Sequence, residues 1–169
     1  MYNDDIESMA IVDPTSGFIY VGIENPSNAI LVYDLMNRTV LMKIPLNSVV
    51  GKSAVLEGLE YIPHVPGYNK PMFFVSAATQ IFGLSINLSA VPPTVETLVV
   101  MDIYTPDELK TDMVKVSDIT HVDDVIYLLL DNLRIVCILN PHRTLSHIII
   151  IIIIIIIIII IIIPIGIHV

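Results

Sequence analysis

Short apolar runs separated by turn-forming residues repeat along the first 147 residues of the chain. The runs are rich in Val, Ile, Leu and Tyr, and they are interrupted by Pro, Gly, Asn and Asp. Such runs are typical of β-strands, whereas a helix requires a period of about 3.6 residues over a longer stretch. Only 105–115, which opens with Pro-Asp-Glu at 106–108, predicts one or two helical turns. The pattern therefore predicts an all-β fold.

A unit of three strands and their turns occurs three times in the chain, and its first strand opens with an acidic or small polar residue. The predicted strands are 7–13, 18–22 and 29–35 in the first copy, 57–63, 72–76 and 80–86 in the second, and 117–122, 125–130 and 133–139 in the third. A fourth strand follows the first copy at 39–45 and the second copy at 95–103.

The spacing of the copies indicates the type of repeat. Matching positions lie ~50 and ~60 residues apart, the size of a four-stranded β-propeller blade with its loops. Asp13-Pro14-Thr15-Ser16-Gly17 has Pro at a favoured turn position and Gly where a positive φ is expected. We therefore predict a domain of residues 1–147 that forms an incomplete β-propeller of about three four-stranded blades, at about 6–46, 55–103 and 116–147.

The net charge bears on whether the chain binds nucleic acid. The chain has 17 acidic and 8 basic residues and a formal charge of −9 at pH 7, and the acidic residues are scattered. Phosphate binding requires clustered Lys and Arg side chains. Nucleic acid is therefore not an expected partner, and the acidic excess indicates solubility.

Single residues add smaller expectations about the compartment. Cys137 is the only cysteine, so no intrachain disulfide can form, and its apolar neighbours predict a buried thiol. Asn37 and Asn87 open N-x-S/T triplets in predicted turns, which is compatible with glycosylation in a secretory lumen. The polar, acidic start of the chain has no signal-peptide pattern.

The run of isoleucines from Ile148 to Ile163 has three interpretations. As a helix it would span ~24 Å, short of the ~30 Å hydrocarbon core of a bilayer, and would form a short membrane anchor. Arg143 before it favours a cytoplasmic propeller, which contradicts glycosylation in a lumen. Alternatively, the run comes from an expanded trinucleotide repeat in a truncated gene. In the third interpretation, its first residues continue an outer strand that begins at His142.

Two segments resemble a known group of propellers. Glu-Gly-Leu-Glu-Tyr at 57–61 and Leu-Val-Tyr-Asp-Leu at 31–35 are similar to six-bladed propellers of the SdiA-regulated and esterase-like-phytase groups. More distantly, the chain is similar to calcium-dependent lactonases and strictosidine-synthase-like propellers, and the resemblance as a whole covers roughly residues 6–147. This resemblance implies a closed ring of about six blades, so that three blades would be a fragment.

The candidate site follows from the inner strands. In a propeller the first strand of each blade lines the central channel, so we expect Glu7, Glu57 and Asp118, with Ser117 beside it, to face a shared axis. The resemblance to lactonases implies that carboxylates at such positions hold calcium, which prefers several oxygen ligands. Solvated strand starts are the alternative interpretation. A structural role is expected for His121.

Catalysis has no sequence motif in its favour. A Gly-x-Ser-x-Gly elbow and a Gly-rich phosphate loop are both absent from the sequence. We therefore expect a propeller-type binding or scaffold protein, anchored in a membrane if the tract Ile148–Ile163 inserts. The alternative is a fragment of a phytase-like or lactonase-like hydrolase whose other blades are missing.

Overall fold

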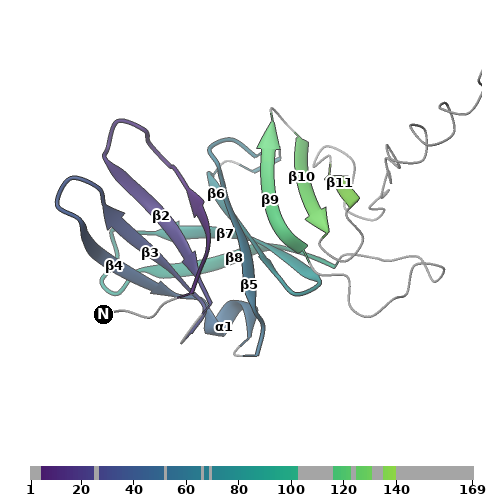
Figure 1. Ribbon diagram of the computed structural model, residues 1–169, viewed down its shortest axis with the longest axis horizontal. Coiled ribbons are helices and arrows are strands. Elements are labelled where there is room, and N and C mark those ends of the chain that lie inside the picture. Colours follow the sequence, from purple (N-terminus) through teal and green to yellow (C-terminus); the bar gives the residue numbers. More distant parts are fainter. Residues whose placement is uncertain are drawn as a thin grey trace, which may run out of the picture.

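Three antiparallel sheets follow one another in chain order in the computed structural model (Figure 1). The structure describes residues 5–24, 27–51, 53–65, 67–68, 70–102, 116–122, 125–130 and 135–139. Sheet 1 contains β1 (Ile6–Ala10), β2 (Phe18–Ile23), β3 (Ala29–Asp34) and β4 (Thr39–Pro45). Sheet 2 contains β5 (Leu56–Ile62), β6 (Met72–Ala77), β7 (Gln80–Asn87) and β8 (Thr94–Asp102). Sheet 3 contains β9 (Val116–Val122), β10 (Val125–Leu130) and β11 (Ile135–Leu139).

The predicted all-β class is confirmed, and the strand bounds lie within two residues of the predicted ones, except that β1 ends at Ala10, three residues before the predicted end. Gly17 has the positive φ expected of its turn, 73°. A short helix that the sequence pattern did not predict, α1 (Asn47–Val50), lies in the connection between sheets 1 and 2. The helical turns predicted in 105–115, and the fourth strand predicted from His142, lie outside the described residues.

Membrane attachment stays a prediction. Within the described part of the chain, no helix has the length and apolar character needed to cross a bilayer. The tract Ile148–Ile163 lies outside that part.

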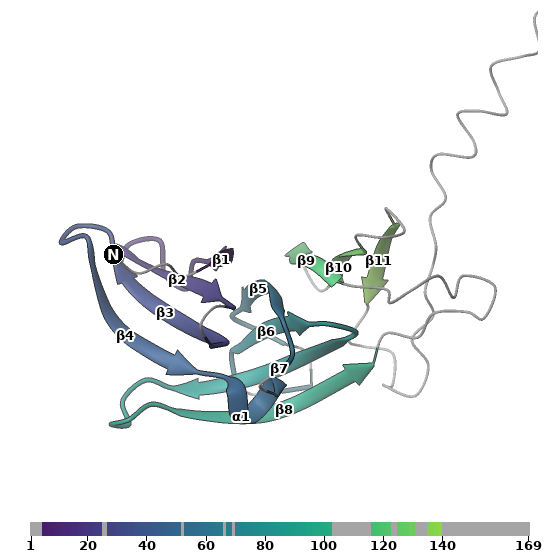
Figure 2. The ribbon, with the colours of Figure 1, turned by 60° about the horizontal axis from the view of Figure 1, so that its bottom comes forward.

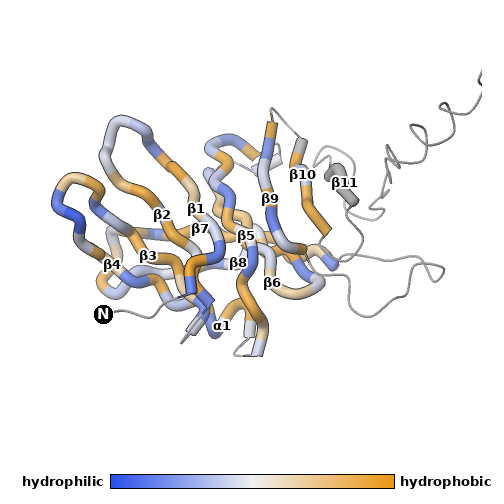
Figure 3. The backbone as a smooth tube through the Cα atoms, in the orientation of Figure 1, coloured by the Kyte–Doolittle hydropathy of each residue, from blue (hydrophilic) through white to orange (hydrophobic). Residues whose placement is uncertain are grey.

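Each sheet is a meander whose strands pair in sequence order. The first strands of neighbouring sheets are in contact, β1 with β5 and β5 with β9 (Figure 2). Apolar residues are concentrated in the strands (Figure 3). The three sheets therefore meet along their first strands.

The register repeats from sheet to sheet. The pairing shifts by one residue in β1 between Ile6 and Ser8, in β5 between Leu56 and Gly58, and in β9 between Val116 and Asp118. Such shifts mark β-bulges, in which one extra residue stands in one strand of a pair. Glu7, Glu57 and Ser117 are thus equivalent residues, and all the remaining positions of the three first strands can be aligned from them.

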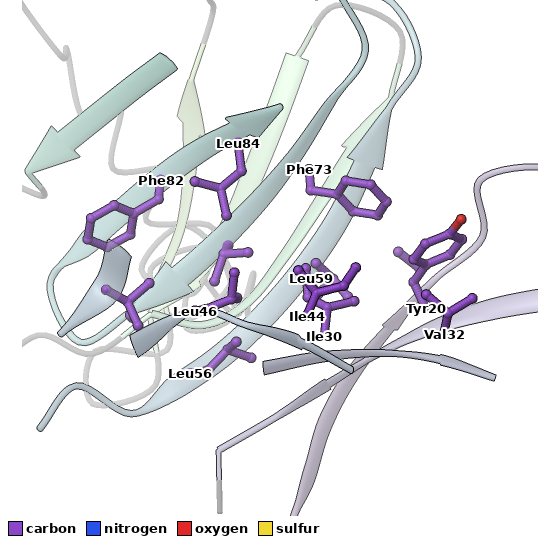
Figure 4. Close-up of a cluster of buried hydrophobic side chains, with 14 residues drawn as sticks. Tyr20, Ile30, Val32, Ile44, Leu46, Leu56, Leu59, Phe73, Phe82 and Leu84 are labelled. Atoms are coloured by element: carbon purple, nitrogen blue, oxygen red, sulfur yellow. The ribbon is translucent and has the colours of Figure 1, made fainter. Parts of the chain in front are cut away.

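An apolar core fills the space between sheets 1 and 2 (Figure 4). The ring centroids of Tyr20 in β2 and Phe73 in β6 are 5.1 Å apart, and the ring centroid of Tyr61 in β5 is also 5.1 Å from that of Phe73. Tilted aromatic pairs at this distance add about 0.5–1.5 kcal/mol beyond the burial of their surface. This aromatic cluster therefore ties sheet 1 to sheet 2.

A second core lies between sheets 2 and 3. Phe74 of β6 packs there with Ile119 of β9 and Leu128 of β10, all three almost fully buried. Because Phe73 and Phe74 point to opposite faces of β6, sheet 2 is covered on both faces.

Two glycines allow the sheets to approach closely. A Cβ added at Gly22 would lie 2.8 Å from Cδ2 of Leu56, and one added at Gly58 would lie 2.8 Å from Cγ2 of Ile119 and 3.1 Å from its backbone nitrogen. Both contacts cross from one sheet to the next. A larger residue at Gly58 would press on the backbone of β9, whereas one at Gly22 would require the side chain of Leu56 to shift.

Asn28 fixes the connection between sheets 1 and 2. Its side chain is buried, and its Nδ2 donates to the carbonyl oxygens of Ala54, at 2.5 Å, and Gly51, at 3.3 Å. Its Oδ1 accepts the backbone N–H of Leu56 at 3.1 Å. The amide therefore forms hydrogen bonds to three backbone groups between Gly51 and Leu56, where β5 begins.

Replacing Asn28 with Ala is expected to lower the free energy of unfolding by about 1–3 kcal/mol, because the N–H of the buried Leu56 and the carbonyl groups of Ala54 and Gly51 would lose their partner. Urea unfolding followed by circular dichroism measures the change. Asn87→Ala is the matched control, since this exposed side chain accepts one hydrogen bond, from the N–H of Ser89 at 3.0 Å. Equal effects of the two substitutions would contradict the role assigned to Asn28.

The aromatic cluster predicts how stability changes in alkaline solution. Burial raises the pKa of Tyr20, and the neighbouring Tyr61 raises it further; burial also raises the pKa of Tyr61. Above a pH of about 10 the unfolded chain loses these protons while the folded chain retains them, so stability falls as the pH rises.

We expect Tyr20→Phe to make this alkaline loss of stability shallower, because one of the two hydroxyl groups with a raised pKa is removed. Unfolding midpoints measured between about pH 8 and pH 11 check the expectation. Tyr33→Phe serves as the control, since this residue of β3 is only partly buried and lies outside the cluster. An unchanged slope in Tyr20→Phe would contradict it.

Candidate functional site

Two of the three residues predicted to bind a metal occupy equivalent places. Glu7 and Glu57 are the bulge residues of β1 and β5, and the bulge residue of β9 is Ser117 rather than Asp118. Glu57 is buried, Glu7 is half-buried and Asp118 is exposed. Asp118 lies one position beyond the bulge, and its Oδ1 accepts the backbone N–H of Ile119 at 2.8 Å.

An acidic group forms around Glu7. Its carboxylate lies with those of Asp5 and Glu24, and one oxygen of each falls within 4.8 Å of the others. The N–H of Glu24 donates to the carbonyl oxygen of Asp5 at 3.2 Å. The group therefore lies next to the start of β1 and the end of β2, where this hydrogen bond continues the pairing of the two strands. Carboxylate oxygens are the ligands that Ca²⁺ prefers. In the described part of the chain, this is the one such group of three acidic, His or Cys side chains.

Glu57 and Asp118 do not belong to this group of three. The structure therefore brings Glu7 together with Asp5 and Glu24, a combination that the sequence reasoning missed. Ile6 pairs with Ile23, and Asp5 and Glu24 are the next residues beyond this pair in the two strands. Knowledge of this register would therefore have indicated that the two carboxylates lie close together. The calcium site of Glu7, Glu57 and Asp118 stays a prediction.

His121 connects two sheets. Its Nδ1 lies 3.0 Å from Oε1 of Glu60, and the two side chains are 26% and 21% exposed. The pair joins β9 to β5 across the interface of sheets 2 and 3. This contact is compatible with the structural role expected of His121, and a partly buried pair of this kind can stabilise the interface modestly.

The two glycosylation triplets lie at equivalent hairpins. Asn37 is in the turn between β3 and β4, and Asn87 ends β7. The backbone N–H and the side-chain amide of Asn37 both donate to Asp34, at 3.0 and 2.7 Å, and together with the N–H of Met36 they lower the pKa of Asp34. The amide nitrogen of Asn37 is thus already engaged in its turn, and glycosylation stays a prediction.

A scan against models of known protein families and a search of curated proteins found no match for the chain. The arrangement of its own residues therefore carries the functional argument.

Calorimetric titration of the full chain with Ca²⁺ tests the predicted site. We expect binding heat that is lost in Glu7→Gln and in Glu57→Gln, because each substitution removes a charged oxygen ligand with little change of shape. Asp5→Asn is the matched control, since Asp5 belongs to the acidic group but not to the predicted set.

The outcomes separate the two arrangements. Heat that is insensitive to Glu57→Gln but lost in Asp5→Asn would contradict the predicted set and leave the acidic group as the binder. No heat in the unmodified chain would contradict calcium binding by either arrangement.

Proposed function

We propose that the chain is a binding or scaffold module built from β-propeller blades, of which it supplies three. The observation that carries this proposal is the common register of the three sheets. Each first strand has its bulge at the same position, and each contacts the first strand of the next sheet. Meanders packed face to face along their first strands are the arrangement of blades around a propeller axis.

The chemistry of the first strands favours binding over catalysis. The repeated bulge residues are Glu7, Glu57 and Ser117, two carboxylates and one hydroxyl, which suit a cation or a polar ligand. His121, the histidine on a first strand, is held by Glu60 rather than by a nucleophilic side chain. A nucleophile would need such a base within hydrogen-bond reach.

A hydrolase of the phytase-like or lactonase-like kind is the second candidate. The resemblance of segments 31–35 and 57–61 supports it, and its remaining site residues would then come from other blades. The two candidates differ in whether a bound substrate is converted.

An assay of the full chain with Ca²⁺ and either phytate or a simple lactone distinguishes them. We expect no phosphate release and no ring opening above the rate measured with Glu57→Gln. Turnover by the unmodified chain that disappears in Glu57→Gln would replace the binding module with the hydrolase. Circular dichroism of both proteins checks that the substitution leaves the sheets intact.

A further inference from the structure

Two turns occupy equivalent places in sheets 1 and 2. Residues 35–38 join β3 to β4, and residues 88–93 join β7 to β8, which are in each case the third and fourth strands of the sheet. Both turns lie at the same end of the molecule, on the left in Figures 1 and 2. They are called the outer turns below.

The outer turns expose four apolar side chains. In the turn of sheet 1, Leu35 is 51% and Met36 is 84% exposed, and in the turn of sheet 2, Leu88 is 36% and Val91 is 97% exposed. Single exposed apolar residues are common on protein surfaces, whereas exposed apolar residues that gather at one end mark a contact surface. The repetition at equivalent turns therefore indicates such a surface.

The outer turn of sheet 1 satisfies its own polar groups. The backbone N–H groups of Met36 and Asn37 donate to Oδ1 of Asp34, at 2.8 and 3.0 Å, and the side-chain amide of Asn37 donates to its Oδ2 at 2.7 Å. Asp34 itself is buried. Donors that already have a partner lower the cost of moving a turn out of water into an apolar medium.

The outer turn of sheet 2 presents little polar backbone and contains no charged side chain. Oδ1 of Asn87 accepts the N–H of Ser89 at 3.0 Å, and the prolines at 92–93 have no N–H that requires a partner. Glu96, the next charged residue along β8, is paired with Lys70 at 3.0 Å. The end of this hairpin is therefore apolar and uncharged.

Charge is distributed unevenly between the two ends of sheet 1. At the end with the outer turn, the exposed residues Arg38 and Asp13 have opposite signs. The acidic group around Glu7 lies beside the other end of β2, roughly 20 Å away along the strand. Because the Debye length in physiological salt is about 8 Å, the field of this group is largely screened at the outer turns. The end with the outer turns is thus close to neutral, although the chain has a formal charge of −9.

We propose that the outer turns insert their apolar side chains into the surface of a lipid bilayer, with the acidic group around Glu7 facing away from it. Binding of this kind grows with the apolar area that is buried among the headgroups. The contact goes beyond the proposed function, since it uses neither the first strands nor the tract Ile148–Ile163.

Shape and charge favour a bilayer over a protein as the partner. Met36 and Val91 protrude from turns of different sheets, and a fluid bilayer can surround each of them, whereas a protein would need a separate pocket for each. The nearly neutral end fits the neutral headgroups of phosphatidylcholine, while the acidic group stays in water. Glycans at Asn37 or Asn87 would hold the turns off the bilayer, so glycosylation and this contact exclude each other.

A fluorophore that responds to its surroundings tests the contact. In a full-length, unglycosylated Cys137→Ala background, Met36→Cys and Val91→Cys are each labelled with NBD and mixed with phosphatidylcholine vesicles. We expect the emission to shift to the blue and to be quenched by lipids with a doxyl group on the acyl chain, because both sites enter the apolar layer. Thr79→Cys is the matched control, since this exposed residue lies in the turn between β6 and β7, at the other end of sheet 2.

A charge on one outer turn checks that the two turns act together. Val91→Glu, added to the labelled Met36→Cys chain, is expected to weaken the quenching by doxyl lipid, because a carboxylate would have to leave water for the apolar layer. Val100→Glu is the matched control, since Val100 is 52% exposed near the other end of β8. Equal quenching in the two variants would overturn the proposal. Circular dichroism checks that both variants keep their sheets.

The other outcomes assign the turns differently, and each would overturn the proposal. If the chain floats with vesicles but neither labelled turn responds, another segment, such as the tract Ile148–Ile163, makes the contact. If the chain does not float, it does not bind the bilayer. A blue shift that needs no vesicles and grows with chain concentration would mean that the turns contact a second copy. An equal response at Thr79→Cys would mean that the outer turns do not direct the insertion. None of these results bears on the first strands, which the Ca²⁺ titration tests separately.

Discussion

The packing of the three sheets depends on close approach at Gly22 and Gly58. At both positions a Cβ would lie 2.8 Å from a side-chain carbon of the next sheet, too short for a van der Waals contact. With hydrogen there instead, Leu56 and Ile119 can lie directly against the neighbouring sheet. The aromatic rings of Tyr20, Phe73 and Phe74 belong to the two cores that lie between the sheets.

Local pattern was sufficient to predict the strands but not the contacts between sheets. Alternating apolar residues and turn residues such as Pro14 and Gly17 act within a few positions, and the observed strands agree with them. The pairing of Glu60 with His121 joins residues 61 positions apart, so no local pattern indicates it. Asn28 is similar, because its role appears only when the loop after α1 returns to it.

In the candidate site too, positions within a strand could be predicted from the sequence, whereas contacts between strands could not. Glu7 and Glu57, which the sequence pattern placed at the openings of their strands, lie at equivalent bulge positions. In β9 the bulge residue is Ser117, and Asp118 lies one position beyond it and accepts the N–H of Ile119. A displacement of one position in a strand changes the face to which a side chain points. Glu24 was missed because it reaches Glu7 across strands.

The number of blades bears directly on whether the repeated bulge positions can hold calcium. One chain offers two carboxylates and one hydroxyl at these positions, whereas Ca²⁺ takes roughly six to eight oxygen ligands. In the proposed propeller, further blades would add equivalent positions around the same axis and would also bring like charges near one another. Binding a cation would relieve that repulsion. In the proposed propeller, a central cation and the addition of further blades would therefore favour each other, because the blades supply oxygen ligands and the cation relieves their repulsion.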